Sequence, residues 1–178
     1  MIETARLILR PWRESDLAPF AELNADPIVM RFLRGVLTRD ESDAYVRRRV
    51  QQHFADHGFA KWAVEAPGLA PFIGAVGLGH VQYEASFTPA VEVAWRLDQR
   101  FWGQGYATEA ARAAMADGFA RLGLREIVAV TTLGNIASQR VMQRLGMTRS
   151  IEFDHPLLAE DSPLRRHILY RLAAPDTV

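Results

Sequence analysis

The stretch RFWGQGYATEAARAAMADGF, residues 100–119, places two glycines directly before a segment rich in alanine. Glycine accepts backbone conformations that other residues avoid, and alanine is the strongest helix former. The first turn of a helix has amide groups without partners and carries a partial positive charge. A glycine loop that opens a helix is therefore either a plain turn or a backbone site for a phosphate group.

Hydrophobic periodicity on both sides of this stretch predicts a mixed α/β protein. The predicted strands are residues 5–10, 59–65, 71–80, 91–97, 126–132, 147–154 and 166–172. The predicted helices are residues 15–25, 39–57, 106–122 and 136–145. Thr38 and Glu41 match a capping box at the start of the second helix, Gly123 is expected to end the third, and Asn135 is expected to cap the fourth. This order is neither a regular βαβ winding nor an all-β sandwich, and we expect one domain over residues 1–178.

Composition excludes several classes of function. Lys+Arg and Asp+Glu both total 21, so no net charge favours a nucleic acid or an acidic membrane. The chain has no cysteine, which excludes disulfides, thiolate metal sites and a cysteine nucleophile. No apolar run has the length of a membrane span, and we expect a cytoplasmic protein. We interpret the spacing of the five histidines as not typical of a metal site, and expect none.

Two common phosphate motifs do not fit the glycine loop. No Walker A string is present, and the dinucleotide fingerprint would need a small residue where Thr108 stands. The string Arg100-x-x-Gly103-x-Gly105 instead resembles the acyl-CoA loop of the GNAT superfamily of N-acetyltransferases. Residues 101–110, FWGQGYATEA, resemble its RimJ/RimL branch closely, as do residues 6–23 and the pair Asn135 and Ser138.

The resemblance implies a fold and a cofactor site. It implies a mostly antiparallel twisted sheet with a splayed parallel strand pair, residues 91–97 and 126–132, flanked by about four helices. Acetyl-CoA is expected to lie between the two splayed strands as cosubstrate. Its pantetheine would contact the backbone of the first strand, and its pyrophosphate the loop amides. The expected cofactor-binding residues are Val93, Trp95, Arg96, Leu97, Arg100, Phe101, Trp102, Gly103, Gln104, Gly105, Tyr106, Ala107, Thr108, Asn135 and Ser138.

The implied reaction is direct attack of a neutral primary amine on the thioester. Glu92 is the candidate general base, and an ordinary strand carboxylate is the competing interpretation. Glu152, Asp154 and His155 are weaker alternatives. Met142 stands where many family members have a tyrosine acid, and methionine cannot donate a proton. Ser138 is therefore the candidate for contact with the leaving thiol, against a plain polar residue near a helix start.

We therefore expect an acetyl-CoA-dependent N-acetyltransferase whose acceptor is a protein N-terminus or a small molecule. A non-catalytic acyl-CoA-binding regulatory module is the main alternative, because the usual tyrosine is missing. A purely structural, dimerising protein is a third. Relatives often form homodimers, so a homodimer is possible here by analogy alone.

Overall fold

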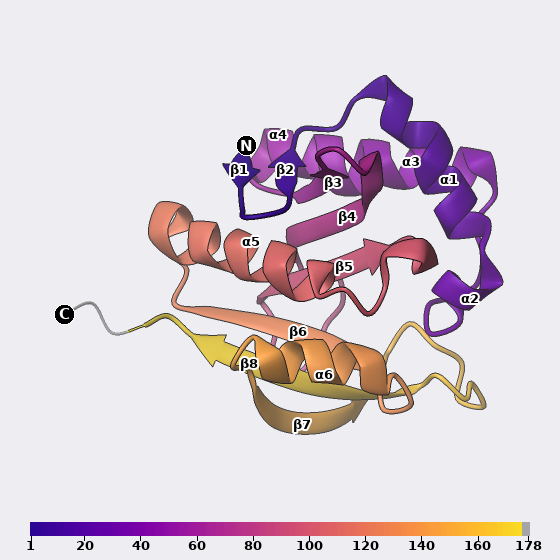
Figure 1. Cartoon of the computed structure of the whole chain (residues 1–178). Coiled ribbons are helices and arrows are strands. Elements are labelled where there is room, and N and C mark those ends of the chain that lie inside the picture. The colour runs from indigo at the N-terminus through magenta and orange to yellow at the C-terminus, as the bar shows by residue number, and fades with distance from the viewer. Residues whose placement is uncertain (176–178) are drawn as a thin grey trace.

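Eight strands form a single sheet in the computed structural model, which describes residues 1–175 (Figure 1). The strands are β1 (Ile2–Glu3), β2 (Ile8–Arg10), β3 (Lys61–Ala66), β4 (Ala70–His80), β5 (Val91–Leu97), β6 (Glu126–Thr132), β7 (Thr148–Asp154) and β8 (Arg166–Ala173). Their order across the sheet is β1-β2-β3-β4-β5-β6-β8-β7. Only β5 and β6 run parallel in this described sheet, which confirms the predicted mostly antiparallel arrangement with one parallel pair.

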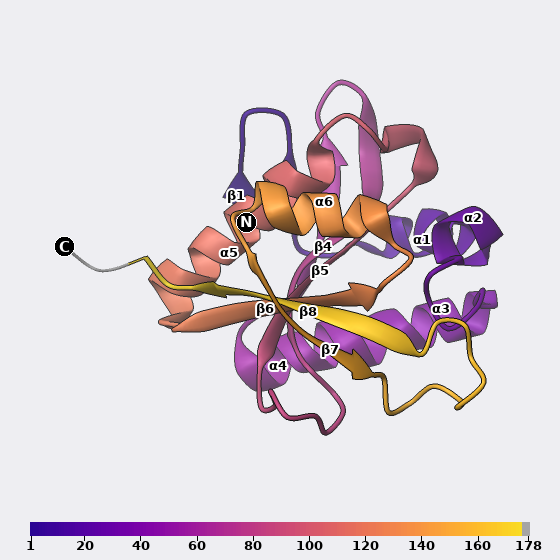
Figure 2. The ribbon, with the colours of Figure 1, turned by 90° about the horizontal axis from the view of Figure 1, so that it is seen from below.

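The helices cover both faces of this sheet. They are α1 (Leu17–Ala25), α2 (Pro27–Met30), α3 (Arg39–Val46), α4 (His53–His57), α5 (Tyr106–Leu122) and α6 (Ile136–Arg144). Figure 2 shows α5 and α6 on one side of the strands and α3 and α4 on the other. A sheet covered on both faces must bury both sets of alternating side chains, which explains the apolar runs along its central strands.

Strand β5 shows how alternation separates the two layers. Val91, Val93 and Leu97 pack with Ala110 and Ala111 of α5 in the larger core. The intervening side chains lie on the opposite face, since successive strand residues point to opposite sides. A second core joins α1, α3 and the strands on that opposite face, with members Phe20, Leu23, Val46, Val50, Ala60, Ala63, Phe72 and Ala75.

Predicted capping patterns set the ends of the helices. Thr38 and Glu41 form the capping box of α3, with both reciprocal hydrogen bonds present. Gly123 ends α5 in the left-handed conformation, as glycine commonly does after a helix. Asn135 caps α6 by accepting from the amide of Ser138. The sequence therefore located these helices almost to the residue.

The structure corrects the prediction in three places. The first strand is only Ile8–Arg10, and an additional short strand, Ile2–Glu3, precedes it. Asp26 ends α1 and also caps an additional short helix, α2, with Pro27 in its first turn. The predicted helix over 39–57 contains a π-helical segment, Arg47–Gln52, between α3 and α4. Periodicity over a few residues does not distinguish these local variations.

Among the helices of residues 1–175, none combines the length and apolar character that crossing a membrane requires.

Candidate functional site

The glycine loop follows β5 and leads directly into α5. Gly103 and Gly105 have φ angles of 75° and 84°, a left-handed region that favours glycine. Gly105 is the N-cap of α5, and no side chain caps the helix there. The two glycines therefore allow a left-handed backbone, as the sequence predicted. They leave the start of α5 without a side-chain cap.

The amide groups from Gly103 to Thr108, here called the amide cradle, lack hydrogen-bond acceptors. Within residues 1–175 none of these six N–H groups donates to a backbone or side-chain atom. The Thr108 hydroxyl at the same helix start is buried and also without a partner among those residues. Unpartnered polar groups beside a helix N-terminus fit an anionic ligand, and a diphosphate supplies the acceptors that they need.

Strands β5 and β6 diverge next to the cradle. β5 pairs with β4 at every residue from Val91 to Leu97, but its register with β6 consists of the one pair Glu92–Val128. The β6-facing edge of β5 beyond Glu92 is therefore unpaired in the described sheet. Figure 1 shows the two strands separating toward the loop that opens α5. An extended ligand carrying amides can pair with such an edge as an added strand.

Several predicted side chains make contacts within the loop itself. The guanidinium of Arg100 lies 2.6 Å from the Asp98 carboxylate, so its charge is already paired. Trp102 donates from Nε1 to the Leu97 carbonyl at 2.8 Å. Gln104 donates to the Arg100 carbonyl at 3.3 Å. These side chains hold the shape of the loop, whereas the backbone amides remain free.

Arg6 is a residue of the site that sequence reasoning missed. Its guanidinium pairs with Glu109 of α5 at 2.6 Å and donates to the Gln104 carbonyl at 3.0 Å. It also lies over the Tyr106 ring, 4.6 Å from the ring centre. Arg6 thus holds the loop between β1 and β2 against the cradle. No local pattern indicates a contact over a separation of 103 residues, although the arginine lies inside the segment that resembles the family.

Asn135 and Ser138 bond to each other at the start of α6. The Asn135 Oδ1 accepts from the Ser138 amide at 3.2 Å, and its Nδ2 donates to the Ser138 Oγ at 3.0 Å. Since Ser138 Oγ is an acceptor in this pair, its own O–H proton is available for another partner. The side chain of Met142, on the same helix, is buried in the larger core.

Glu92 belongs to a polar group on the other face of β5. Burial raises the pKa of Glu92, and the positive charges of Lys61 and Arg49 oppose that rise. Burial disfavours ionisation of Tyr45, but the charges of Lys61 and Arg96 outweigh it and lower the pKa of Tyr45. The Arg96 guanidinium lies 5.3 Å from the centre of the Tyr45 ring. A half-buried carboxyl group with a raised pKa is a candidate general base.

Arg96 joins this polar group to the helices. Its Nη1 donates to Asn24 of α1, whose amide donates in turn to Ser42 of α3 at 2.8 Å. Its partner in this network is neutral, and burial lowers the pKa of Arg96. The Arg96 side chain therefore points away from the α5 face, and any contact of this residue with pantetheine falls to its backbone.

The weaker candidates for the general base lie on β7 or directly after it, and β7 is two strands away from β6 in the sheet. Glu152 and Asp154 are on the edge strand β7, where they pair with Arg149 and Arg166 at the surface. Burial and the neighbouring His167 lower the pKa of His155 to about 4. Glu152 and Asp154 therefore stay at the sheet edge, whereas His155 packs against Tyr83, 4.4 Å between ring centres, and Tyr83 is close enough to Glu92 for their charges to interact.

Three histidines cluster elsewhere in the molecule. His53 and His57 of α4 and His80 at the end of β4 have nitrogen atoms that all lie within 4.8 Å of one another. His53 and His57 are four residues apart and share one helix face, so the histidine spacing gives no ground for excluding a metal site. That spacing was the signal available in the sequence, and only folding adds His80.

Known proteins resemble this chain along most of its length. The model of the acetyltransferase (GNAT) domain matches residues 6–148. The chain is 32% identical over 145 residues to the uncharacterized protein YkkB of Bacillus subtilis, covering 81% of this chain and 83% of that protein. It is 33% identical over 153 residues to the FsC-acetyl coenzyme A-N(2)-transacetylase of Aspergillus fumigatus, covering 83% of this chain but 64% of that enzyme.

Solved structures show the same fold. The ribosomal L7/L12 α-N-protein acetyltransferase RimL, solved in complex with coenzyme A, superposes with a TM-score of 0.76 at 19% identity. The superposition covers 96% of this chain and 95% of that one.

Proposed function

Because the chain belongs to the GNAT acetyltransferase family, we propose that it transfers the acetyl group of acetyl-CoA directly to a primary amine in a ternary complex. Acetyl-CoA is the acetyl donor throughout this family, and the chain is an N-acetyltransferase. The acceptor, either a peptide N-terminus or a small molecule, is part of the proposal. The observation that carries the proposal is the amide cradle, six free N–H groups beside the unpaired edge of β5.

The proposed binding mode uses backbone groups on the donor side. The cradle Gly103–Thr108 would hold the diphosphate, and the free edge of β5 from Val93 to Leu97 would pair with the pantetheine amides. A free N–H on this edge could also stabilise the oxyanion that develops at the thioester. Asn135 and Ser138, on the helix after β6, would contact the end of the cofactor near the sulfur.

The proposed chemistry places Glu92 on the amine side. The amine nitrogen bonds to the carbonyl carbon as its proton passes to the Glu92 carboxylate, directly or through water. The carbon–sulfur bond then breaks, and the Ser138 hydroxyl donates a hydrogen bond to the leaving thiolate, which takes up a proton from water while Glu92 returns its own proton to water. The products are an amide and coenzyme A with a free thiol. A raised pKa suits Glu92 to this role, since a base acts best with a pKa near the working pH.

The charges on the amine side favour an acceptor that carries a carboxylate. Lys61, Arg49 and Arg96 are close enough to act on Glu92 or Tyr45, and Glu92 is the one carboxylate among these coupled groups. A polyamine would add positive charge to a region that is already cationic. We therefore propose an amino acid or a short peptide as acceptor in preference to a polyamine.

Calorimetry and thiol release together test the proposal. We expect coenzyme A to bind the purified chain, and free thiol to appear from acetyl-CoA when an amino acid or peptide amine is added. Spermidine serves as the matched cationic amine. Tight coenzyme A binding without thiol release for any amine would favour a non-catalytic module. Absence of coenzyme A binding would refute the cradle itself, and faster release with spermidine would refute the preferred acceptor.

A further inference from the structure

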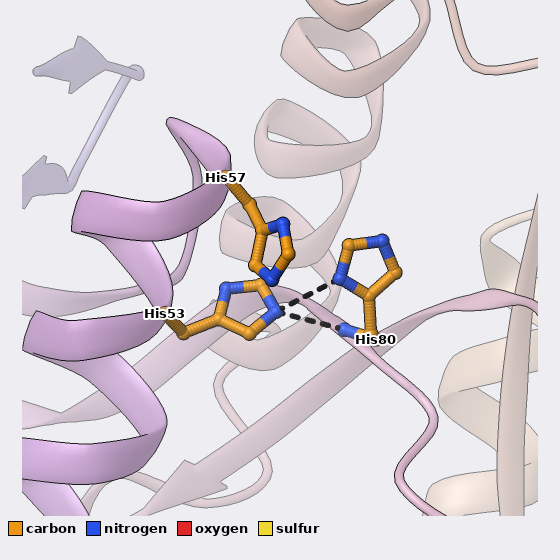
Figure 3. Close-up of side chains that lie close together, drawn as sticks. All are labelled: His53, His57 and His80. Atoms are coloured by element: carbon orange, nitrogen blue, oxygen red, sulfur yellow. Dashed lines mark hydrogen bonds between the residues drawn. The ribbon is translucent and has the colours of Figure 1, made fainter.

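We propose that His53, His57 and His80 form a site for one zinc ion, separate from the amide cradle. Figure 3 shows the three imidazole rings turned toward one another, two from α4 and one from the end of β4. The ring centres of His57 and His80 lie 4.5 Å apart, and those of His53 and His57 lie 4.6 Å apart. Imidazole nitrogen is a common zinc ligand.

The contacts of His53 show which of its nitrogen atoms carries the lone pair that an ion needs. Its Nδ1 lies 2.7 Å from the Phe59 carbonyl oxygen, which can only accept a hydrogen bond, so Nδ1 carries the proton. The Nε2 lone pair accepts a hydrogen bond from the His80 backbone amide at 3.2 Å and lies 3.1 Å from His80 Nδ1, so an ion bound to Nε2 replaces the hydrogen bond to that amide. A metal-binding histidine is typically held in this way, with its second nitrogen bonded to a carbonyl or carboxylate.

One of the three nitrogen separations is close to that of a zinc site. Zinc–nitrogen bonds of about 2.0–2.1 Å in a tetrahedral site place two ligand nitrogens about 3.3 Å apart. The His53 Nε2 to His80 Nδ1 distance is 3.1 Å, so this pair is already near that spacing. The exposed side chain of His57 completes the set by a small rotation, because all three ligand atoms lie within 4.8 Å. The fourth position would remain for water.

The ligand type and local charge select the class of ion. The cluster offers three neutral nitrogens and no carboxylate, a set that suits zinc and similar transition metals better than magnesium or calcium. The charges of Lys61 and Arg49 act on His53 and oppose any cation. Binding therefore depends on the coordinate bonds themselves. Because these bonds would join α4 to the end of β4, an ion at this site would stabilise the folded chain.

Titration of the chain with Zn²⁺ tests the site. The protein should carry no polyhistidine tag, and Mg²⁺ serves as the comparison ion. We expect one Zn²⁺ per chain by calorimetry and a melting temperature raised by about 5–10 °C at free Zn²⁺ near 100 times its Kd. Mg²⁺ should cause no such shift.

Three variants separate a three-histidine site from simpler explanations. H57A and H80A should each weaken Zn²⁺ binding at least about tenfold, since even outer-shell partners are worth 10- to 100-fold. Q51A changes an exposed residue just before α4 and should bind Zn²⁺ like the parent chain. Binding that survives H80A would mean that the helix pair alone holds the ion, and the proposal would be wrong. Failure of the parent chain to bind one equivalent would refute it as well.

Discussion

Glu92 lies where β5 and β6 make their one paired contact, and burial raises the pKa of its carboxyl group. A general base acts in its charged form. With Glu92 as the proposed base, we therefore expect full activity above this pKa and a loss of activity as the pH falls through it. This loss should occur at a higher pH than for an ordinary glutamate, whose pKa is about 4.3.

The variant E92Q tests this role. We expect kcat to fall about 100-fold or more, because a general base contributes at least that factor in typical enzymes. Coenzyme A affinity should stay unchanged, since Glu92 is on the amine side. The acidic limb of the kcat/KM profile should disappear, leaving only the titration of the acceptor amine. If the variant retains the parent rate and pH profile, Glu92 is an ordinary strand carboxylate and not the general base.

Ser138 is the second residue whose role depends on a proton. Its Oγ accepts from Asn135 at 3.0 Å, so the hydroxyl proton can point toward a leaving sulfur. We expect S138A to lower turnover by about tenfold, in line with the loss of one hydrogen bond of about 1–1.5 kcal/mol, while coenzyme A binds nearly as before. Steady-state kinetics and calorimetry on the same sample measure both. An unaltered rate would remove Ser138 from the mechanism.

At the scale of elements, α5 connects the backbone of the cradle to the core. Its alanines allow close packing against β4 and β5, and its open N-terminus faces the loop. Arg6 and Glu109 fix that end to the first loop of the chain. Because α5 is packed on the core and held at its start, the amides of the cradle are fixed in position, which pre-organises them for a ligand.

The variant G105A tests the conformation of the cradle. Alanine at a φ of 84° is strained by about 1–2 kcal/mol, and its Cβ would lie 3.4 Å from the Arg6 guanidinium. We expect coenzyme A affinity to fall roughly 5- to 30-fold, the equivalent of that strain. G123A is the matched control, because Gly123 has a φ of 64° at the other end of α5. If both variants bind coenzyme A equally well, the cradle conformation is not what holds the ligand.

For the whole molecule, Arg10 connects four segments through one buried network. Its guanidinium binds Asp16 at 2.8 Å, Glu65 at 2.7 Å and the Pro71 carbonyl at 2.6 Å. Arg10 and Asp16 are 3% and 2% exposed, so water cannot replace a lost partner. The network ties β2 and the turn before α1 to β3 and the start of β4, and thus holds the amine-side layer on the sheet.

The variant D16A should therefore destabilise the whole fold. Removing one partner of a buried ion pair costs about 3–5 kcal/mol. We expect the lower end of this range, because Glu65 remains as a partner for the Arg10 charge. We expect the melting temperature to fall by about 6–12 °C. D43A removes the exposed i,i+4 pair with Arg39 and should change stability by less than about 1 kcal/mol. Similar losses in both variants would contradict the importance of the buried network.

Local sequence patterns determined much of this protein. The alternation of Val91–Leu97, the capping residues Thr38 and Asn135, and the glycines before α5 predicted elements that the structure confirms. These features depend on interactions within a few residues, so the chain encodes them locally. The loop motif, residues 6–23 and the pair Asn135 and Ser138 also carry the resemblance to the family.

Only the tertiary structure decided which distant groups meet. The free edge of β5 follows from its divergence from β6, which a single strand cannot reveal. Arg6 reaches Glu109 across 103 residues, and His53 meets His80 across 27. Such contacts arise because the sheet twists and its helices pack on particular faces. The spacing of neighbouring residues predicts neither effect. The sequence thus specified the glycine loop and its backbone conformation, while folding assembled the groups around it.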